Sequence, residues 1–149
     1  KTLKKCEEIL KTFDLQSEKK IISAHRTPKR LYQYADNLKN TDVKIVIAGA
    51  GGAAHLPGMV ASLTHIPVFG VPIESKSLKG LDSLLSIVQM PAGISVPTLA
   101  IGVPGAINAA LSVISILSLN DNELRKKLVK YRNKQTQSIK SKPTNKLLR

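Results

Sequence analysis

Two histidines and a glycine-rich segment are the parts of this sequence best suited to chemistry. His25 and Arg26 lie in Ser23–Pro28, which reads S-A-H-R-T-P, and His55 follows the segment Gly49–Gly52. An imidazole titrates near neutral pH without any perturbation, so it can give and take a proton within one reaction. A guanidinium is a permanently charged fork that binds phosphate or carboxylate. These residue types together indicate proton transfer on an anionic substrate.

The segment Val43–Met59 is expected to place His55. Its β-branched residues up to Ile47 predict a buried strand, Gly49–Gly52 predicts a tight turn, and a helix is expected to begin near His55. Glycine permits positive φ and close approach of a ligand to the main chain, and a helix N-terminus favours an anion. We therefore expect a phosphate or carboxylate to bind at this turn.

His25 and Arg26 are expected at the end of a second strand. Lys20–Ser23 is a short strand candidate, and Thr27 is predicted to cap a helix whose first residue is Pro28. Open α/β sheets bind their ligands beyond the carboxyl ends of parallel strands. Histidines at two such ends therefore point to one site. His65 has no such context, and we interpret it as structural.

Alternating helix and strand patterns along the chain predict an α/β domain with a parallel sheet. Asp121 is expected to cap the last helix. The helix from Pro104 to Leu119 is so apolar that we expect it to be buried at the sheet or at a subunit contact. Further helices are predicted over residues 2–13, 28–38, 55–64, 80–88 and 121–139, and further strands over 67–71 and 98–101.

The composition is that of one globular domain. The chain has 149 residues, of which 42% are hydrophobic and 22% charged, enough for a sizeable aliphatic core. No apolar run approaches the roughly 20 residues of a membrane helix, and the first residues lack a secretory signal. Cys6 is the single cysteine, and three scattered histidines without paired carboxylates do not predict a metal site. We expect a cytoplasmic protein without metal, cofactor or membrane.

The net charge of +13 is concentrated near the N-terminus and after Glu123. A basic run of this kind can bind nucleic acid. It lacks a recognised binding motif and interleaved aromatics beyond Tyr131, so a solvated helix face and tail are the preferred interpretation. We expect one domain over residues 1–140 and a disordered basic tail over residues 141–149. A positive field would also attract a phosphorylated substrate.

Two other activities fit the motifs poorly. Gly49-x-Gly51-x-x-Ala54 is a loosened dinucleotide fingerprint, with Glu74 near the position of a ribose-binding acid. Pro57 and the lack of room for a substrate domain count against it. No G-x-S-x-G nucleophile elbow is present, which disfavours a serine hydrolase.

Four longer motifs occur in order: S-A-H-R-T-P at Ser23–Pro28, I-A-G-A-G-G-A-A-H-L-P-G-M at Ile47–Met59, G-V-P-I at Gly70–Ile73, and G-L-D-S-L-L-S-I-V-Q-M-P-A-G-I at Gly80–Ile94. They closely resemble the N5-carboxyaminoimidazole ribonucleotide mutase family, the class I form of the phosphoribosylaminoimidazole carboxylase catalytic subunit. Class II enzymes, which carboxylate aminoimidazole ribonucleotide directly with CO2, tend to read S-A-H-K-G-P at the first motif.

The resemblance implies a flavodoxin-like three-layer sandwich with a parallel sheet, a C-terminal helix and a homo-octameric assembly. It also implies a functional link to the ATP-dependent N5-carboxyaminoimidazole ribonucleotide synthase. The family's first strand ends in a Gly-Ser-x-Ser-Asp segment that binds the ribose phosphate. This sequence begins in the helix that follows, so we expect the first strand to be missing from the chain as given.

The implied activity is an isomerase step of de novo purine biosynthesis, in which a carboxylate moves from the exocyclic nitrogen to C4 of the imidazole. His25 matches the family's general acid/base. The alternatives are a direct CO2-dependent carboxylase and a non-catalytic nucleotide- or nucleic-acid-binding module. The substrate-binding positions carried over from the resemblance are Ser23, Arg26, Gly49, Ala50, Gly51, Gly52, Ala53, His55 and Leu56.

Overall fold

The computed structural model describes residues 2–141 of the chain. Along this range the elements follow in the order α1 (Thr2–Thr12), α2 (Pro28–Leu38), β1 (Val46–Gly51), α3 (Leu56–Ala61), β2 (Val68–Ile73), α4 (Leu81–Val88), α5 (Val103–Leu117) and α6 (Asn122–Ser138). The predicted helices are all present. The helix expected to reach Thr64 ends earlier, at Ala61.

The two strands lie side by side and run parallel. Val46 of β1 is opposite Val68 of β2, and Gly51 is opposite Ile73. A parallel pair needs a crossover connection, and α3 supplies it. The predicted α/β class with a parallel sheet is thus confirmed.

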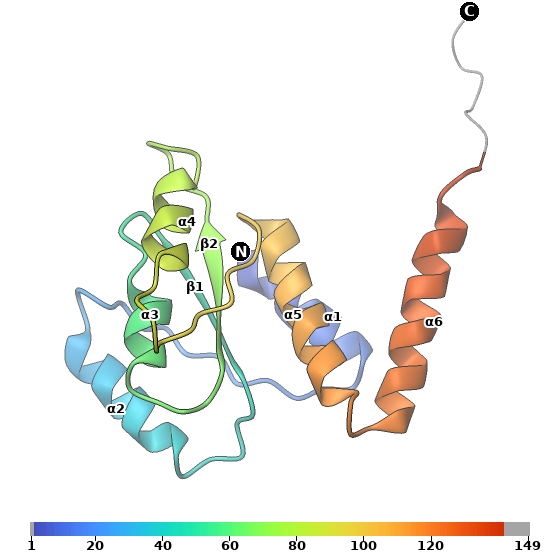
Figure 1. Ribbon diagram of the computed structural model, residues 1–149, viewed down its shortest axis with the longest axis horizontal. Helices are drawn as coiled ribbons and strands as arrows, with labels where there is room; N and C mark the ends of the chain where they lie inside the picture. Colours follow the sequence, from blue (N-terminus) through green and yellow to red (C-terminus); the bar gives the residue numbers. More distant parts are fainter. Residues whose placement is uncertain (1, 142–149) are drawn as a thin grey trace, which may run out of the picture.

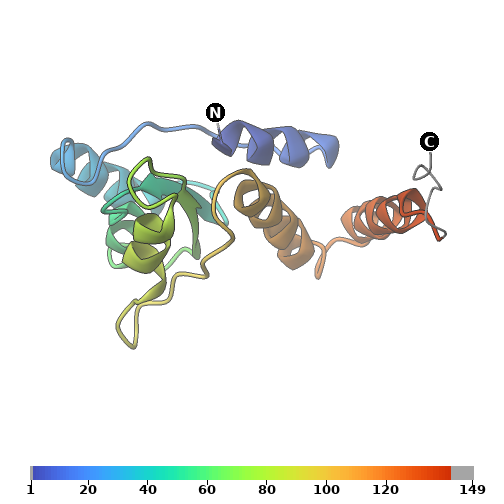
Figure 2. The ribbon, with the colours of Figure 1, turned by 90° about the horizontal axis from the view of Figure 1, so that it is seen from above.

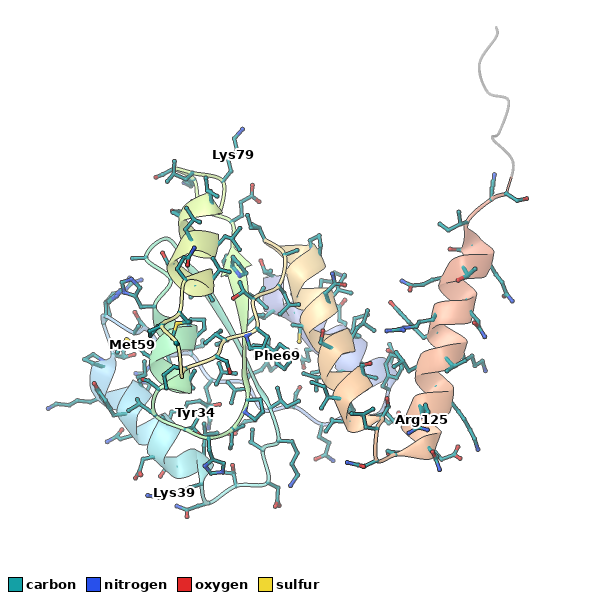
Figure 3. The ribbon with its side chains drawn as sticks, in the orientation of Figure 1. Tyr34, Lys39, Met59, Phe69, Lys79 and Arg125 are labelled. Carbon is teal, nitrogen blue, oxygen red and sulfur yellow. The ribbon has the colours of Figure 1, made fainter. Side chains whose placement is uncertain are left out.

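Helices cover both faces of this sheet (Figure 1). Because successive side chains of a strand point to opposite faces, Val68 packs toward α2 and α3 while Phe69 packs toward α1 and α5. Figure 3 shows Phe69 on the side of β2 that faces α5. Helix, sheet and helix therefore form three layers, the arrangement expected of a flavodoxin-like domain.

The apolar helix α5 is buried against the sheet and α1, as predicted. Ala106, Ala110 and Ile114 form one fully buried face and share a core with Cys6 and Leu10 of α1. The last turn of α5 and the residues after it still expose large apolar side chains, Ile116 at 43% and Leu119 at 68%. The expected subunit contact remains a prediction.

Helix α6 extends away from the rest of the molecule (Figure 2). Asp121 caps it as predicted, because its side chain accepts a hydrogen bond from the Leu124 N–H at 2.9 Å. Only Leu124 and Leu128 are buried among its described residues, and its lysines and arginines are exposed. This matches the predicted solvated basic face. Of the predicted tail, all but Ser141 lies outside the described residues.

The strand predicted at Lys20–Ser23 does not form. A strand requires a neighbouring strand to complete its ladder of hydrogen bonds. Among residues 2–141, the ladder contains only β1, β2 and one bridge at Thr98. The segment before His25 therefore remains an irregular connection between α1 and α2.

The strand predicted at Thr98–Ile101 is reduced to a single bridge, Thr98 to Gly70. Gly70 donates its N–H to the Pro97 carbonyl and accepts from the Leu99 N–H, each at 2.9 Å. Two residues further along β2, Pro72 has no N–H with which to continue the ladder. The proline in G-V-P-I thus interrupts the ladder toward residues 98–101, although its carbonyl accepts from the Gly102 N–H at 2.8 Å and the pairing of β2 with β1 continues to Ile73.

Candidate active site

The glycine segment belongs mostly to the strand and not to a turn. Strand β1 runs through Gly51, which corrects the prediction of a turn over Gly49–Gly52. A Cβ at Gly49 would meet the Leu3 side chain at 3.0 Å, so this glycine permits packing of α1 against the strand. Gly52 alone among the four has positive φ, at 70°, and begins the turn.

Ser83 of α4 holds that turn in place, and Ser86 of the same helix lies beside it. The buried Ser83 hydroxyl accepts a hydrogen bond from the Gly52 N–H at 2.9 Å and donates one to the Ile73 carbonyl at 2.6 Å. Ser86 lies one helical turn further on, where its hydroxyl donates to the Asp82 carbonyl of its own helix at 2.6 Å and lies 3.2 Å from the Gly52 carbonyl oxygen. Sequence reasoning missed both serines. Their spacing in D-S-L-L-S puts both on one helix face, and this pattern could have indicated a shared polar contact.

His55 is the N-cap residue of α3, as expected from the sequence. Its backbone is fixed because its N–H donates to the Ala53 carbonyl and its own carbonyl accepts from the Met59 N–H. The preceding Ala54 is 1% exposed. The His55 side chain makes no capping hydrogen bond, and its exposed ring is available for other contacts.

His25 lies in a tight turn that Ser23 and Thr27 close. The Thr27 N–H and hydroxyl both donate to the Ser23 carbonyl at 2.9 Å, and the Thr27 hydroxyl oxygen accepts from the Ser23 N–H at 2.8 Å. The Ser23 hydroxyl accepts from the Arg26 N–H at 3.3 Å. Ala24 is buried and anchors the turn. Thr27 and Pro28 occupy the predicted N-cap and first helical positions, but the Thr27 side chain bonds to Ser23 and makes no capping hydrogen bond to α2.

The two histidines meet, although 30 residues separate them in sequence. Nε2 of His25 lies 2.9 Å from Nδ1 of His55, within hydrogen-bond distance. The rings are nearly perpendicular, at 85°, with centroids 4.9 Å apart. The two histidines that were predicted to lie near each other are therefore in direct contact, although the strand predicted before His25 does not form.

The other candidate residues surround this pair to different degrees. Arg26 is exposed next to His25, and Ala53 is exposed next to the turn. Ala50 and Leu56 are half-buried, with Ala50 packed toward the cluster that contains Ala54. Gly49 has only main-chain atoms to offer, and the position that a Cβ would take is filled by Leu3 of α1 and Ile73.

Neither of the two hollows described on the surface is lined by these residues. One of about 320 Å³ lies beside α2, between Tyr34 and residues 18–22, and the other follows the exposed side of α6. Within residues 2–141, no three histidine, cysteine, aspartate or glutamate side chains are grouped closely enough to hold a metal ion. In the same range, no helix combines the length and apolar character that crossing a membrane requires.

Comparison with known proteins identifies the family. Residues 1–138 match the family model described as AIR carboxylase. The chain belongs to this family. Its AIR carboxylase relatives include the N5-carboxyaminoimidazole ribonucleotide mutase of Vibrio parahaemolyticus, 51% identical over 142 residues, which covers 95% of this chain and 88% of the relative. The mutase of Pyrococcus abyssi is 56% identical over 130 residues, or 87% of this chain and 74% of the relative.

Solved structures agree with the AIR carboxylase assignment. The crystal structure of Treponema denticola PurE superposes with a TM-score of 0.81 at 29% sequence identity, covering 90% of this chain and 82% of that one. The predicted flavodoxin-like fold is thereby confirmed. The resemblance to the mutase family, inferred from four motifs, is confirmed as well.

Proposed function

We propose that this chain converts N5-carboxyaminoimidazole ribonucleotide to 4-carboxy-5-aminoimidazole ribonucleotide, with His25 as the general acid/base. The observation that carries the proposal is the meeting of His25 and His55 at 2.9 Å beside the glycine turn. It is supported by the mutase names of relatives about half identical to this chain over most of its length. The reaction is an isomerisation and belongs to purine biosynthesis.

The chemistry requires one proton to be given and one to be taken. When the bond between the exocyclic nitrogen and the carboxylate carbon breaks, CO2 leaves and the nitrogen gains a proton. When C4 bonds to that CO2, C4 loses its hydrogen as a proton. A single imidazole that begins in its protonated form can give its proton to the nitrogen and then take one from C4, so no net proton exchange with solvent is needed. We assign this role to His25 because it matches the general acid/base of the family, and its ring is exposed at the turn.

The neighbouring residues suit the rest of the substrate. Arg26 is exposed beside His25 and provides a fork for the nucleotide phosphate. Gly52 and Ala53 carry little or no side chain, so a planar imidazole could approach their main chain closely. The Gly52 N–H is already bonded to Ser83, and we therefore assign it to positioning and not to substrate.

The test of His25 is the variant His25→Asn. We expect the purified protein to fold normally and to lose turnover of N5-carboxyaminoimidazole ribonucleotide by about a hundredfold or more, because general acid–base catalysis contributes about 10²–10⁴. The matched control is His65→Asn, since His65 is also an exposed histidine and lies beyond the end of α3. Near-normal mutase activity in His25→Asn would refute the assignment.

A second candidate is the direct carboxylation of aminoimidazole ribonucleotide by CO2. The family description, AIR carboxylase, favours it. The same fold would serve both reactions, and only the substrate differs. Supplying the protein with either N5-carboxyaminoimidazole ribonucleotide or aminoimidazole ribonucleotide with bicarbonate separates the two. We expect product from the first substrate at low bicarbonate.

We further propose that the protein works as a homo-octamer in the cytoplasm, supplied with substrate by the ATP-dependent synthase. Exposed apolar side chains on two helices support a subunit contact, Leu81 and Leu85 on α4 and Ile116 on α5. Light scattering coupled to size-exclusion chromatography would measure the assembly state. A monomer at micromolar concentration would contradict this part of the proposal and leave the activity open.

A further inference from the structure

A short distance and a nearly perpendicular ring angle define the contact between the two imidazoles. Nε2 of His25 and Nδ1 of His55 are 2.9 Å apart, and the rings meet edge to face at 85°. One of these nitrogens must carry a proton and the other must present a lone pair. For the remaining ring nitrogens, His25 Nδ1 and His55 Nε2, the structure shows no hydrogen bond within residues 2–141.

Both rings are attached to backbone that cannot easily shift. His25 follows the buried Ala24 in the turn that Ser23 closes with Thr27. His55 follows Ala54, which is 1% exposed, at the start of α3. The two rings are held by separate elements, so their contact depends on how the turn before α2 packs against the start of α3.

When both rings are neutral, their protons can be placed on the ring nitrogens in two ways that keep this hydrogen bond. If His25 carries its proton on Nε2, it donates to His55 Nδ1, and His25 Nδ1 keeps a free lone pair. If the shared proton belongs to His55, both rings must carry their protons on Nδ1. The first arrangement places both rings in the Nε2–H form, the more stable neutral tautomer of histidine. It leaves His25 Nδ1 as the nitrogen that carries the transferred proton: the charged ring gives this proton to the exocyclic nitrogen, and the neutral ring then takes one from C4.

We infer that His55 is a positioning residue for His25. Its Nδ1 accepts the Nε2–H of His25, fixes that tautomer, and thereby directs His25 Nδ1 to the reacting atoms. This role rests on the proposed function of His25. It adds to the substrate-binding role that the sequence predicted for His55. Orientation of a catalytic imidazole by a hydrogen bond to its other nitrogen is a general way to set its tautomer.

The test uses three variants and two measurements. His55→Ala removes the acceptor, whereas His55→Asn keeps an amide oxygen near the position of Nδ1. His65→Asn is the matched control. Side-chain ¹H–¹⁵N correlation spectra, recorded without substrate above the histidine titration range, report the tautomer of His25. Its signals are assigned by their disappearance in His25→Asn.

We expect the wild-type protein and His55→Asn to show His25 in the Nε2–H form, and His55→Ala to show a mixture of tautomers. In turnover, His55→Ala should lower kcat about tenfold or more with little change in KM, and His55→Asn should recover much of that loss. An unchanged His25 tautomer in His55→Ala would overturn the proposal, as would a rise in KM alone. The tautomer result stands apart from the proposed function, which is tested by the turnover of His25→Asn.

Discussion

Ser83, fully buried on α4, accepts a hydrogen bond from the main-chain N–H of Gly52 at 2.9 Å. The same hydroxyl donates to the Ile73 carbonyl at 2.6 Å, so one oxygen joins the ends of β1 and β2. Gly52 begins the turn that leads to His55. The geometry of the candidate site therefore depends on a residue that lies outside it.

Replacing Ser83 with alanine should destabilise the protein. The change leaves the half-buried Gly52 N–H and Ile73 carbonyl without the partner that the fully buried Ser83 provided, which costs about 1–3 kcal/mol. For a chain of this size each kcal/mol lowers Tm by about 2–4 °C. Thermal unfolding followed by circular dichroism measures the shift. Ser86→Ala is the matched control and should shift Tm less, because Ser86 is only half-buried.

The protein should lose stability in acid through Glu7. Hydrogen bonds from Lys11 and Lys19 lower the pKa of the Glu7 carboxyl from 4.5 to about 2. Because the folded-state pKa lies below the unfolded value, the stabilisation is present above about pH 4.5 and disappears as the pH falls toward 2. Glu7→Gln should therefore flatten the fall of Tm across this range. Asp42→Asn, at an exposed position, should leave the profile unchanged.

Most helices could be predicted from the sequence because their signals are local. Thr27 with Pro28 indicated the start of α2, and Asp121 indicated the start of α6. Each signal lies within one helical turn of the element that it predicts. Leu31 and Leu38 lie on one face of α2, and both are buried as helical periodicity requires.

The errors arose where distant residues decide the structure. Lys20–Ser23 has the composition of a strand but no neighbouring strand among residues 2–141. Gly49 fits either a turn or a crowded strand, and only the position of Leu3 decides between them. The two histidines were predicted to share a site, yet their direct contact and the role of Ser83 depend on α4 and on side-chain geometry.

The single cysteine should be unreactive while the protein is folded. Burial, reinforced by the nearby Glu7, raises the pKa of the Cys6 thiol to about 11. The thiolate is the reactive form, so little of it exists at pH 8. We expect Ellman's reagent to react slowly with the native protein and rapidly in denaturant. Immediate reaction of the native protein would show that α1 does not pack as described.

Gly105→Ala should be among the most damaging single changes in this chain. A Cβ at Gly105 would lie 1.6 Å from the Ala100 carbonyl oxygen, because the loop before α5 crosses its first turn at this point. Overpacking that side chains can relieve costs about 1–3 kcal/mol, and a main-chain carbonyl has less freedom to move aside. We therefore expect a loss of at least about 3 kcal/mol in the free energy of unfolding, measured by urea titration. Gly51→Ala is the matched control, since its Cβ would meet Ile73 at an ordinary 3.4 Å. If both variants unfold at the same urea concentration, the close approach of this loop to α5 does not exist in solution.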